Sequence, residues 1–393
     1  MLATLTPTVA VQSLRAQVTR PAPTGTVVRH TAGTLVPALW TADTPATPLG
    51  RGREDGSFLF ADVIGLAFLD DDRLLVADGQ SSELRVFSLR EQRHLSTIAK
   101  KGQGPGEIED LWSLWRTPNG IVAEDAAGKA SLFHSDGRFV RVMPRVNAGA
   151  AQRADRIGMV NDTLAVVRLV DRVPEMKVGE ERVISMGLAL ASGATPQTVV
   201  RYPERQVVRR TEGRPRANVF GATTIAAVAK DRLCVGHPDR YIIDCYSVVG
   251  RHLHRIERTA MPSVRVTEQR RADYFAGEAA ANPGPRGAAY VAQLRSAVRF
   301  AATVPMFGEF IGASNGDLWV GPYIPAGPLP AKRTFLERST TWSVFSPTGQ
   351  WKADVQLPAR FQLLAIDGNR LAGVARTVED VEQVVILQLK APR

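Results

Sequence analysis

Two histidines are the first candidates for chemistry in this 393-residue chain. His252 and His254 lie two apart on an expected strand, where alternate side chains share a face, so they could hold a metal ion together with a carboxylate. Arg251 and Arg255 flank the pair, and we therefore favour a solvated strand face. The chain has no G-x-S-x-G sequence, and the motifs assign no catalytic residue.

Aspartates mark the ends of two neighbouring strands in the first half of the chain. Asp70, Asp71 and Asp72 suggest calcium by type, but their spacing differs from that of an EF-hand loop, and a turn is the better interpretation. Asp78 ends the next apolar run. We expect its carboxylate to accept hydrogen bonds from the amides of the following turn, and ligand contact is the alternative.

A glycine-rich loop follows, with the sequence GQGPGE. Glycine-rich loops can direct backbone amides at a phosphate, but this one lacks the Gly-Lys-Ser/Thr ending of a P-loop. Gly-Pro-Gly is turn chemistry in the first place. We therefore interpret Gly102, Gly104, Pro105 and Gly106 as a structural linker between two repeats.

The segment after the linker contributes further binding candidates. Trp112 and Trp115 lie on an expected innermost strand, where indole rings could line a channel and contact a ligand. Packing between neighbouring repeats is the alternative. Glu107 and Asp110 are candidate acids, although spacing alone does not assemble a ligand set around them. Together with Asp78, these residues form the predicted binding set.

An internal repeat predicts the fold. Alternating runs such as RLLVAD and ELRVFS, separated by GQSS, are typical of strands in a hairpin. The unit recurs at steps of 46, 44, 69, 85 and 54 residues, marked by Val76, Val122, Val166, Val235, Val320 and Val374. Four short strands in about 40–50 residues are typical of propeller blades. The sequence therefore predicts an all-β, six-bladed β-propeller with four-stranded blades.

Two further features complete the predicted domain, residues 24–393. A bulky residue is followed four positions later by the turn glycines Gly137, Gly250 and Gly349. Residues 267–301 read as two helices inserted between blades 4 and 5, with Tyr290, Leu294 and Val298 on their packed face. Further insertions are expected at 171–181 and 322–340. The sequence of the last blade provides only three strands before the chain ends. We therefore expect a strand from within residues 24–48 to supply the fourth strand of that blade.

The two cysteines, Cys234 and Cys245, allow one structural expectation. Alignment of the fourth repeat on the first places them at the positions of Leu75 and Val86, opposite each other in one hairpin. They would form a disulfide in an exported protein and remain buried thiols in a reducing cytosol. Residues 1–23 are a leader or a flexible terminus, in which a secretory signal would need a positive start and a longer apolar run.

Composition excludes several classes of protein. The chain is 44% hydrophobic and 22% charged, and it has no apolar run long enough to span a membrane. Its net charge is +10, with 41 arginines and eight lysines. The arginines are scattered through the sequence, so we expect an arginine-rich surface and no nucleic-acid partner.

The first repeat also resembles a known family. GLAFLDDDRLLVADGQSSELRVFS followed by KKGQGPGE is similar to NHL-repeat blades of bacterial six-bladed propellers, in which a GxGPGEF-like sequence commonly follows a blade. Ile108 stands here in place of the usual phenylalanine. The resemblance runs from about Gly50 to the C-terminus and implies the fold more than an activity.

We therefore expect a monomeric, non-catalytic binding protein, periplasmic or secreted, that recognises a protein or small-molecule ligand at one propeller face and needs no cofactor. Export follows from the resemblance and from the N-terminal sequence. The alternative is a lactonase-like hydrolase with Ca²⁺ or Mg²⁺ in the central channel, as in some six-bladed propellers.

Overall fold

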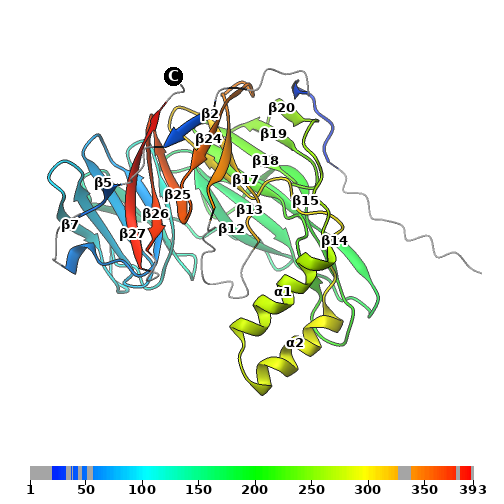
Figure 1. The fold of residues 1–393 in the computed structure, drawn as a ribbon. Coiled ribbons are helices and arrows are strands. Elements are labelled where there is room, and N and C mark those ends of the chain that lie inside the picture. Colours follow the sequence, from blue (N-terminus) through cyan, green and yellow to red (C-terminus); the bar gives the residue numbers. More distant parts are fainter. Residues whose placement is uncertain are drawn as a thin grey trace, which may run out of the picture.

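The computed structural model describes residues 20–31, 37, 39–42, 47–50, 56–325, 338–377 and 381–390. Within them the fold is all-β with two α-helices, and the sheets are curled (Figure 1). The predicted all-β class and the predicted pair of helices are therefore confirmed. Residues 1–19 of the predicted leader and residues 326–337 of the predicted 322–340 insertion lie outside the described residues.

Most of the chain forms six successive antiparallel meanders, in which each strand pairs with the next. The first comprises β4 (Val63–Phe68), β5 (Arg73–Asp78), β6 (Glu83–Ser88) and β7 (Arg93–Ala99). The second comprises β8 (Leu111–Arg116), β9 (Gly120–Asp125), β10 (Ala130–His134) and β11 (Phe139–Val142). The third comprises β12 (Gln152–Met159), β13 (Ala165–Asp171), β14 (Glu181–Ala191), β15 (Gln197–Val208) and the short β16 (Arg216–Ala217).

The second half continues the pattern. The fourth meander comprises β17 (Ile225–Ala229), β18 (Arg232–Gly236), β19 (Ile242–Ser247) and β20 (His252–Arg258). The fifth comprises β21 (Glu309–Gly312), β22 (Leu318–Gly321), β23 (Thr340–Phe345) and β24 (Trp351–Leu357). The sixth comprises β25 (Phe361–Asp367), β26 (Arg370–Arg376) and β27 (Glu382–Lys390).

N-terminal strands pair with the later meanders. β2 (Leu39–Ala42) lies between β24 and β27, which joins the fifth and sixth meanders into one sheet, and β3 (Thr47–Pro48) also pairs with β27. The predicted N-terminal strand beside the last strands is thus present. β1 (Thr26–His30), from the same predicted segment, instead runs parallel to β20 and covers the outer edge of the fourth meander.

The first strands of the meanders contact one another in a closed cycle. β4 contacts β8, and the contacts continue through β12, β17, β21 and β25 back to β4. Within the described residues, six hydrophobic clusters each join two neighbouring meanders of this cycle. For example, Phe68 and Phe87 pack with Val374 and Val384 of the last meander. The core is therefore distributed around the cycle.

The sequence repeat corresponds to equivalent positions in this arrangement. The six repeat valines all lie on the second strands of the meanders and are at most 3% exposed. Gly137, Gly250 and Gly349 have φ angles of 94°, 82° and 84°, so each turn needs the left-handed conformation that glycine adopts readily. The first meander lacks the glycine, and Gln92 takes a positive φ of 49° there.

The two helices of the insertion project away from the sheets (Figure 1). They pack on a small core of their own. α1 (Glu268–Ala281) begins at Thr267, whose side chain caps the helix, and α2 (Pro285–Ala297) follows. In the second half of α2 and directly after it, the buried side chains include Val291, Leu294 and Val298. The predicted Tyr290 is wrong as a packed residue, because it is 38% exposed and Val291 takes its place one position along the helix. Neither helix is long and apolar enough to cross a membrane within the described residues.

Candidate functional site

A cavity of about 570 Å³ lies among the six first strands. Each strand contributes residues from its C-terminal end or from the turn that follows. The lining consists of Leu66–Phe68, Leu114–Pro118, Ile157–Val160, Ala227, Val228, Lys230, Phe310–Ser314 and Leu364–Ile366. Because all six meanders supply a wall, the cavity exists only in the closed cycle.

Small residues let the first strands converge around this cavity. A Cβ atom on Gly312 would lie 1.9 Å from the carbonyl oxygen of Val228 on the neighbouring strand. A Cβ on Gly158 would lie 2.6 Å from a methyl group of the same valine. Real Cβ atoms do not approach other atoms so closely, so the strand spacing here depends on glycine.

The cavity wall is apolar and its mouth is cationic. Apolar side chains such as Trp115 and Leu364 form the wall. Arg116 is the last residue of β8, Lys230 directly follows β17, and both are exposed. Among the described residues neither cation forms an ion pair, although Arg116 donates a hydrogen bond of 3.3 Å to the carbonyl of Leu69. Both guanidinium and ammonium N–H groups are therefore available at the mouth.

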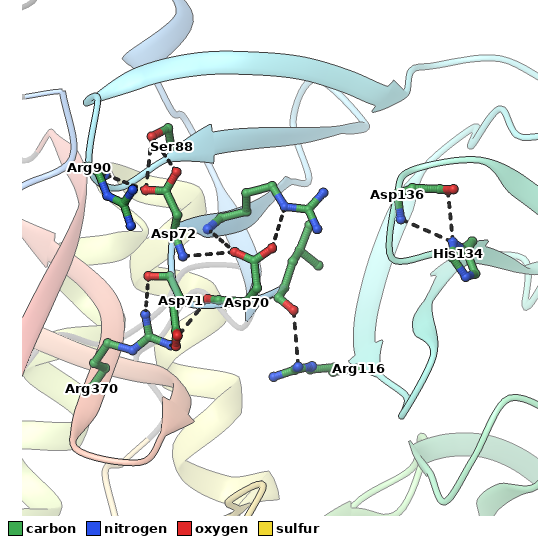
Figure 2. Close-up of polar contacts among 11 residues, drawn as sticks. Asp70, Asp71, Asp72, Ser88, Arg90, Arg116, His134, Asp136 and Arg370 are labelled. Atoms are coloured by element: carbon green, nitrogen blue, oxygen red, sulfur yellow. Dashed lines mark hydrogen bonds and ion pairs between the residues drawn. The ribbon is translucent and has the colours of Figure 1, made fainter.

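The aspartates at residues 70–72 form a turn beside this mouth (Figure 2). Asp70 accepts hydrogen bonds from the amides of Asp72 and Arg73 and from the Arg73 guanidinium. Partial burial alone would raise the pKa of Asp70, but these hydrogen bonds outweigh it and lower the pKa. Asp72 accepts from the Ser88 hydroxyl and from the Arg90 amide. The carboxylates thus serve the turn, as the sequence predicted.

Hydrogen bonds between neighbouring meanders connect the turns around the mouth. Figure 2 shows Arg370 and Arg116 reaching the turn of the first meander from either side. Arg370 donates to the carbonyl of Asp71 at 2.7 Å. Further contacts of this kind join Asn119 to Asp162 at 2.9 Å, Ser314 to Asp367 at 3.2 Å and Arg232 to the carbonyl of Gly316. The mouth is therefore held by contacts between turns that are distant in sequence.

The structure separates the predicted binding residues. Trp115 lies in the cavity wall, whereas Trp112 is not among the lining residues and is 70% exposed. Asp78 is buried in an ion pair with Arg85, at 2.7 Å, and accepts a hydrogen bond from the Gln80 amide.

The acidic candidates after β7 also lie apart from the cavity lining. The Glu107 carboxylate accepts a hydrogen bond from the Gly104 amide within the linker loop, and Asp110 is exposed. Gly106 has a φ of 79°, as expected of a turn. The GQGPGE sequence thus occupies the connection between β7 and β8, where its glutamate folds back on the Gly104 amide.

The donor set of the cavity does not fit a calcium or magnesium ion. Both ions prefer carboxylate and carbonyl oxygens. The lining contains no aspartate or glutamate, and no group of three His, Cys, Asp or Glu side chains suited to a metal occurs in the described part of the chain. A metal held by side chains of this cavity is not supported by its chemistry.

The expectation that His252 and His254 share a face is wrong. A β-bulge in β20 makes His252 pair with Tyr246 and His254 pair with Cys245. The Nε2 atom of His252 lies 2.8 Å from Asp244, and the ring of His254 lies beside Gly349 of another meander. The extra residue shifts the alternation, so the two rings do not converge on one ligand.

A buried polar network surrounds Asp244. This residue is 1% exposed and receives two hydrogen bonds from Arg255, at 2.8 and 2.9 Å, and one from the Tyr202 hydroxyl at 2.5 Å. Burial alone would raise the pKa of Asp244, but hydrogen bonds from Arg255, Tyr202 and His252 outweigh it and lower the pKa. Arg255, Tyr202 and His252 all direct polar atoms at the buried carboxylate, and we interpret the network as structural.

The cysteines are joined in the hairpin of the fourth meander. Cys234 and Cys245 are direct partners in the β18–β19 register and form a disulfide. Leu75 and Val86 occupy the equivalent paired positions in the first meander, as the repeat alignment predicted.

Sequence reasoning missed Arg116 and Lys230. The available signal was their position, since each basic residue stands where an expected first strand meets its turn. Their convergence on one cavity was not visible in the sequence, because they lie 114 positions apart in the chain.

Comparison with known proteins shows similarity in fold alone. No family model and no curated protein matches the sequence. A member of the DUF4221 family from Bacteroides vulgatus is 12% identical and superposes with a TM-score of 0.53, covering 90% of this chain and 98% of that one. At this identity the likeness concerns the fold.

Two other solved structures are similar at lower TM-scores, too low to carry an argument. A protein of Bacteroides fragilis named as an exported protein is 13% identical, with a TM-score of 0.47 over 94% of this chain and 100% of that one. The calcium-binding protein regucalcin from Agrobacterium tumefaciens is 8% identical, with a TM-score of 0.41 over 91% and 98%.

Proposed function

We propose that the chain is a six-bladed β-propeller of NHL-like type that binds a small-molecule ligand in its central cavity without catalysis. Each meander would be one blade, and β2 and β3 would complete the last one. The closed cycle of first strands and the six clusters between neighbouring meanders support this count. An axial cavity is the expected consequence of such a ring.

The observation that carries the function is the combination of an apolar wall with two cations at the mouth that form no ion pair in the described part of the chain. Ligand sites are typically concave and mostly apolar, with a few polar groups that set orientation. Here Arg116 and Lys230 would be those groups. The ligand class that fits is an apolar body, of a size suited to about 570 Å³, that carries an anionic group at one end.

The alternative function is a Ca²⁺- or Mg²⁺-dependent hydrolase. Such an enzyme would need carboxylate ligands for the ion, and the lining of the cavity contains no aspartate or glutamate. Elemental analysis of the purified protein and a lactone assay with and without chelator test it. A stoichiometric divalent ion together with chelator-sensitive turnover would replace the binding proposal.

We also propose that the protein acts outside the cytoplasm. The disulfide between Cys234 and Cys245 supports this setting, because disulfides persist in oxidising compartments. Fractionation of cells that produce the full-length protein would test the proposal, and recovery in the cytoplasm alone would contradict it.

Binding can be tested with anilinonaphthalene sulfonate, which joins an aromatic body to an anion. Fluorescence titration of the folded protein should show saturable binding. Leu364→Trp, which fills the cavity, should weaken it about tenfold or more, and Lys230→Gln about threefold.

Arg138→Gln is the matched control, because Arg138 is exposed and lies outside the lining. This variant should bind like the wild type. Circular dichroism must show native folding for each variant, since the probe also binds loosely packed states. Equal binding by the wild type and Leu364→Trp would contradict the proposal.

A further inference from the structure

A second cavity, of about 500 Å³, lies beneath the helical insertion and shares no lining residue with the central cavity. Its lining residues come from α1, from α2 and the residues after it, and from the segment that follows β15. Three stretches of sequence therefore meet at this place. The cavity is unlike the first one in its chemistry.

Four of the nine lining residues are arginines. They are Arg210 after β15, Arg271 on α1, Arg295 on α2 and Arg299 just beyond α2. The lining contains one carboxylate, Glu268. Four like charges around one small volume repel one another, and such an arrangement is stabilised when an anion occupies it.

Two of the guanidinium groups are neutralised by partners in the protein. Arg271 forms an ion pair with Glu268 at 3.0 Å, and Arg299 forms one with Glu181 of β14. The other two are not. Among the described residues Arg210 donates to the carbonyl of Val298 at 2.7 Å, and neither it nor Arg295 forms an ion pair. Two positive charges are therefore left for a ligand.

Aromatic rings hold two guanidinium groups in place. Arg295 lies over the ring of Phe275, 4.2 Å from its centroid, and Arg271 lies over Phe300 at 5.5 Å. Stacking uses the face of a guanidinium and leaves the N–H groups at its edge free for hydrogen bonds. Such oriented forks suit the paired oxygens of carboxylate and phosphate groups.

We propose that this cavity binds a small organic molecule with two or more carboxylate or phosphate groups. Arg210 and Arg295, which form no ion pair within the described residues, match a doubly charged ligand, and the cavity volume admits a compact one. Nucleic acid fits less well, because base stacking needs open aromatic faces and Phe275 is only 7% exposed. The site does not depend on the function proposed for the central cavity.

Isothermal titration calorimetry of the full chain at low ionic strength tests the proposal. Pyrophosphate and citrate are the probes, and they separate phosphate from carboxylate recognition. At least one should bind with a stoichiometry of one. Arg295→Gln and Arg210→Gln should each weaken binding about tenfold, which corresponds to one lost charge-assisted interaction. Arg295→Lys should restore only part of the affinity, because lysine keeps the charge but lacks the planar fork.

Arg286→Gln is the matched control. Arg286 lies on α2, is exposed and does not line the cavity. Its replacement therefore removes one positive charge from the same helix as Arg295→Gln does. Its affinity should remain within about twofold of the wild type. Equal losses from Arg286→Gln and Arg295→Gln would reveal general surface attraction and overturn the proposal. So would the absence of binding by either anion at about 10 mM.

Discussion

Arg370 donates a hydrogen bond of 2.7 Å to the backbone carbonyl of Asp71, 299 residues earlier in the chain. Its guanidinium also lies over the ring of Phe68, 4.7 Å from the centroid, and pairs with Asp367 at 2.5 Å. One side chain thus joins the first strand of the first meander to the last meander. It connects the two ends of the cycle at the mouth of the central cavity.

Loss of this side chain should destabilise the fold. We expect Arg370→Ala to lower the free energy of unfolding by about 2 kcal/mol, because hydrogen bonds and cation–π packing are lost together. Urea denaturation at neutral pH measures the change. Arg138→Ala, which removes an exposed arginine paired with Asp136, should cost less than about 0.5 kcal/mol. Equal losses of stability in Arg370→Ala and Arg138→Ala would contradict a role of Arg370 in closing the cycle of meanders.

The buried network around Asp244 should be the most sensitive polar site. Asp244→Asn leaves the buried Arg255 without its counter-charge, so we expect a loss of about 3–5 kcal/mol. The double variant Asp244→Asn/Arg255→Met should lose less than the sum of the two single changes. Additive losses in urea denaturation would mean that the two residues act independently.

Two buried histidines should make stability depend on pH. Burial lowers the pKa of both His237 and His254 to about 4, below the value of about 6.5 in an unfolded chain. Between these values the unfolded state binds more protons, so stability is complete above about pH 6.5 and falls as the pH drops toward 4. Each group contributes at most about 1.4 kcal/mol per pH unit.

Urea denaturation between neutral pH and pH 5 measures this slope. His254→Gln should reduce the slope. A slope that is unchanged in His254→Gln would contradict the assignment of this residue.

Alanine should have opposite effects on stability at two glycines, one where the first strands approach closely and one with open space around it. Gly312→Ala should destabilise the protein by about 2 kcal/mol or more, because the new Cβ would meet the carbonyl of Val228 at 1.9 Å. Gly277→Ala, in α1 with open space around it, should stabilise the protein by about 0.5–1 kcal/mol. Thermal unfolding of both variants gives the comparison. A neutral Gly312→Ala would show that the strands are free to separate.

The disulfide can be tested in exported protein. Alkylation without reductant, followed by mass spectrometry, should leave Cys234 and Cys245 unmodified, and alkylation after reduction should modify both. Replacing both with serine should cost about 2–3 kcal/mol, as expected for a short closed loop. Two alkylated thiols in the unreduced exported sample would disprove the bond in the mature protein.

Local features were predictable from the sequence because they depend on near neighbours. Val76, Val122 and the other repeat valines lie at equivalent buried positions, and Gly137, Gly250 and Gly349 adopt positive φ angles in their turns. The helices at 267–301 were recognisable from their composition and breaks. A period of two residues, a turn that needs glycine and a helix cap are all local in origin.

Other features were beyond the sequence because they depend on small shifts or on distant pairings. The bulge in β20 separates His252 from His254 by inserting one residue, and alternation alone gives no sign of it. Tyr290 gave way to Val291 through a rotation of one helical position. Both errors arose where side-chain direction was inferred from spacing.

By itself, then, the sequence determined the strands, the turns and the repeat, since each is encoded within a few tens of residues. Only the tertiary structure decided which side chains share a site. Arginines that look scattered in the chain converge under α1 and α2, and Arg116 and Lys230 converge on one cavity mouth. The physical reason is closure of the cycle, which brings together strand ends and turns from all six meanders and thereby creates both the cavity wall and its charge.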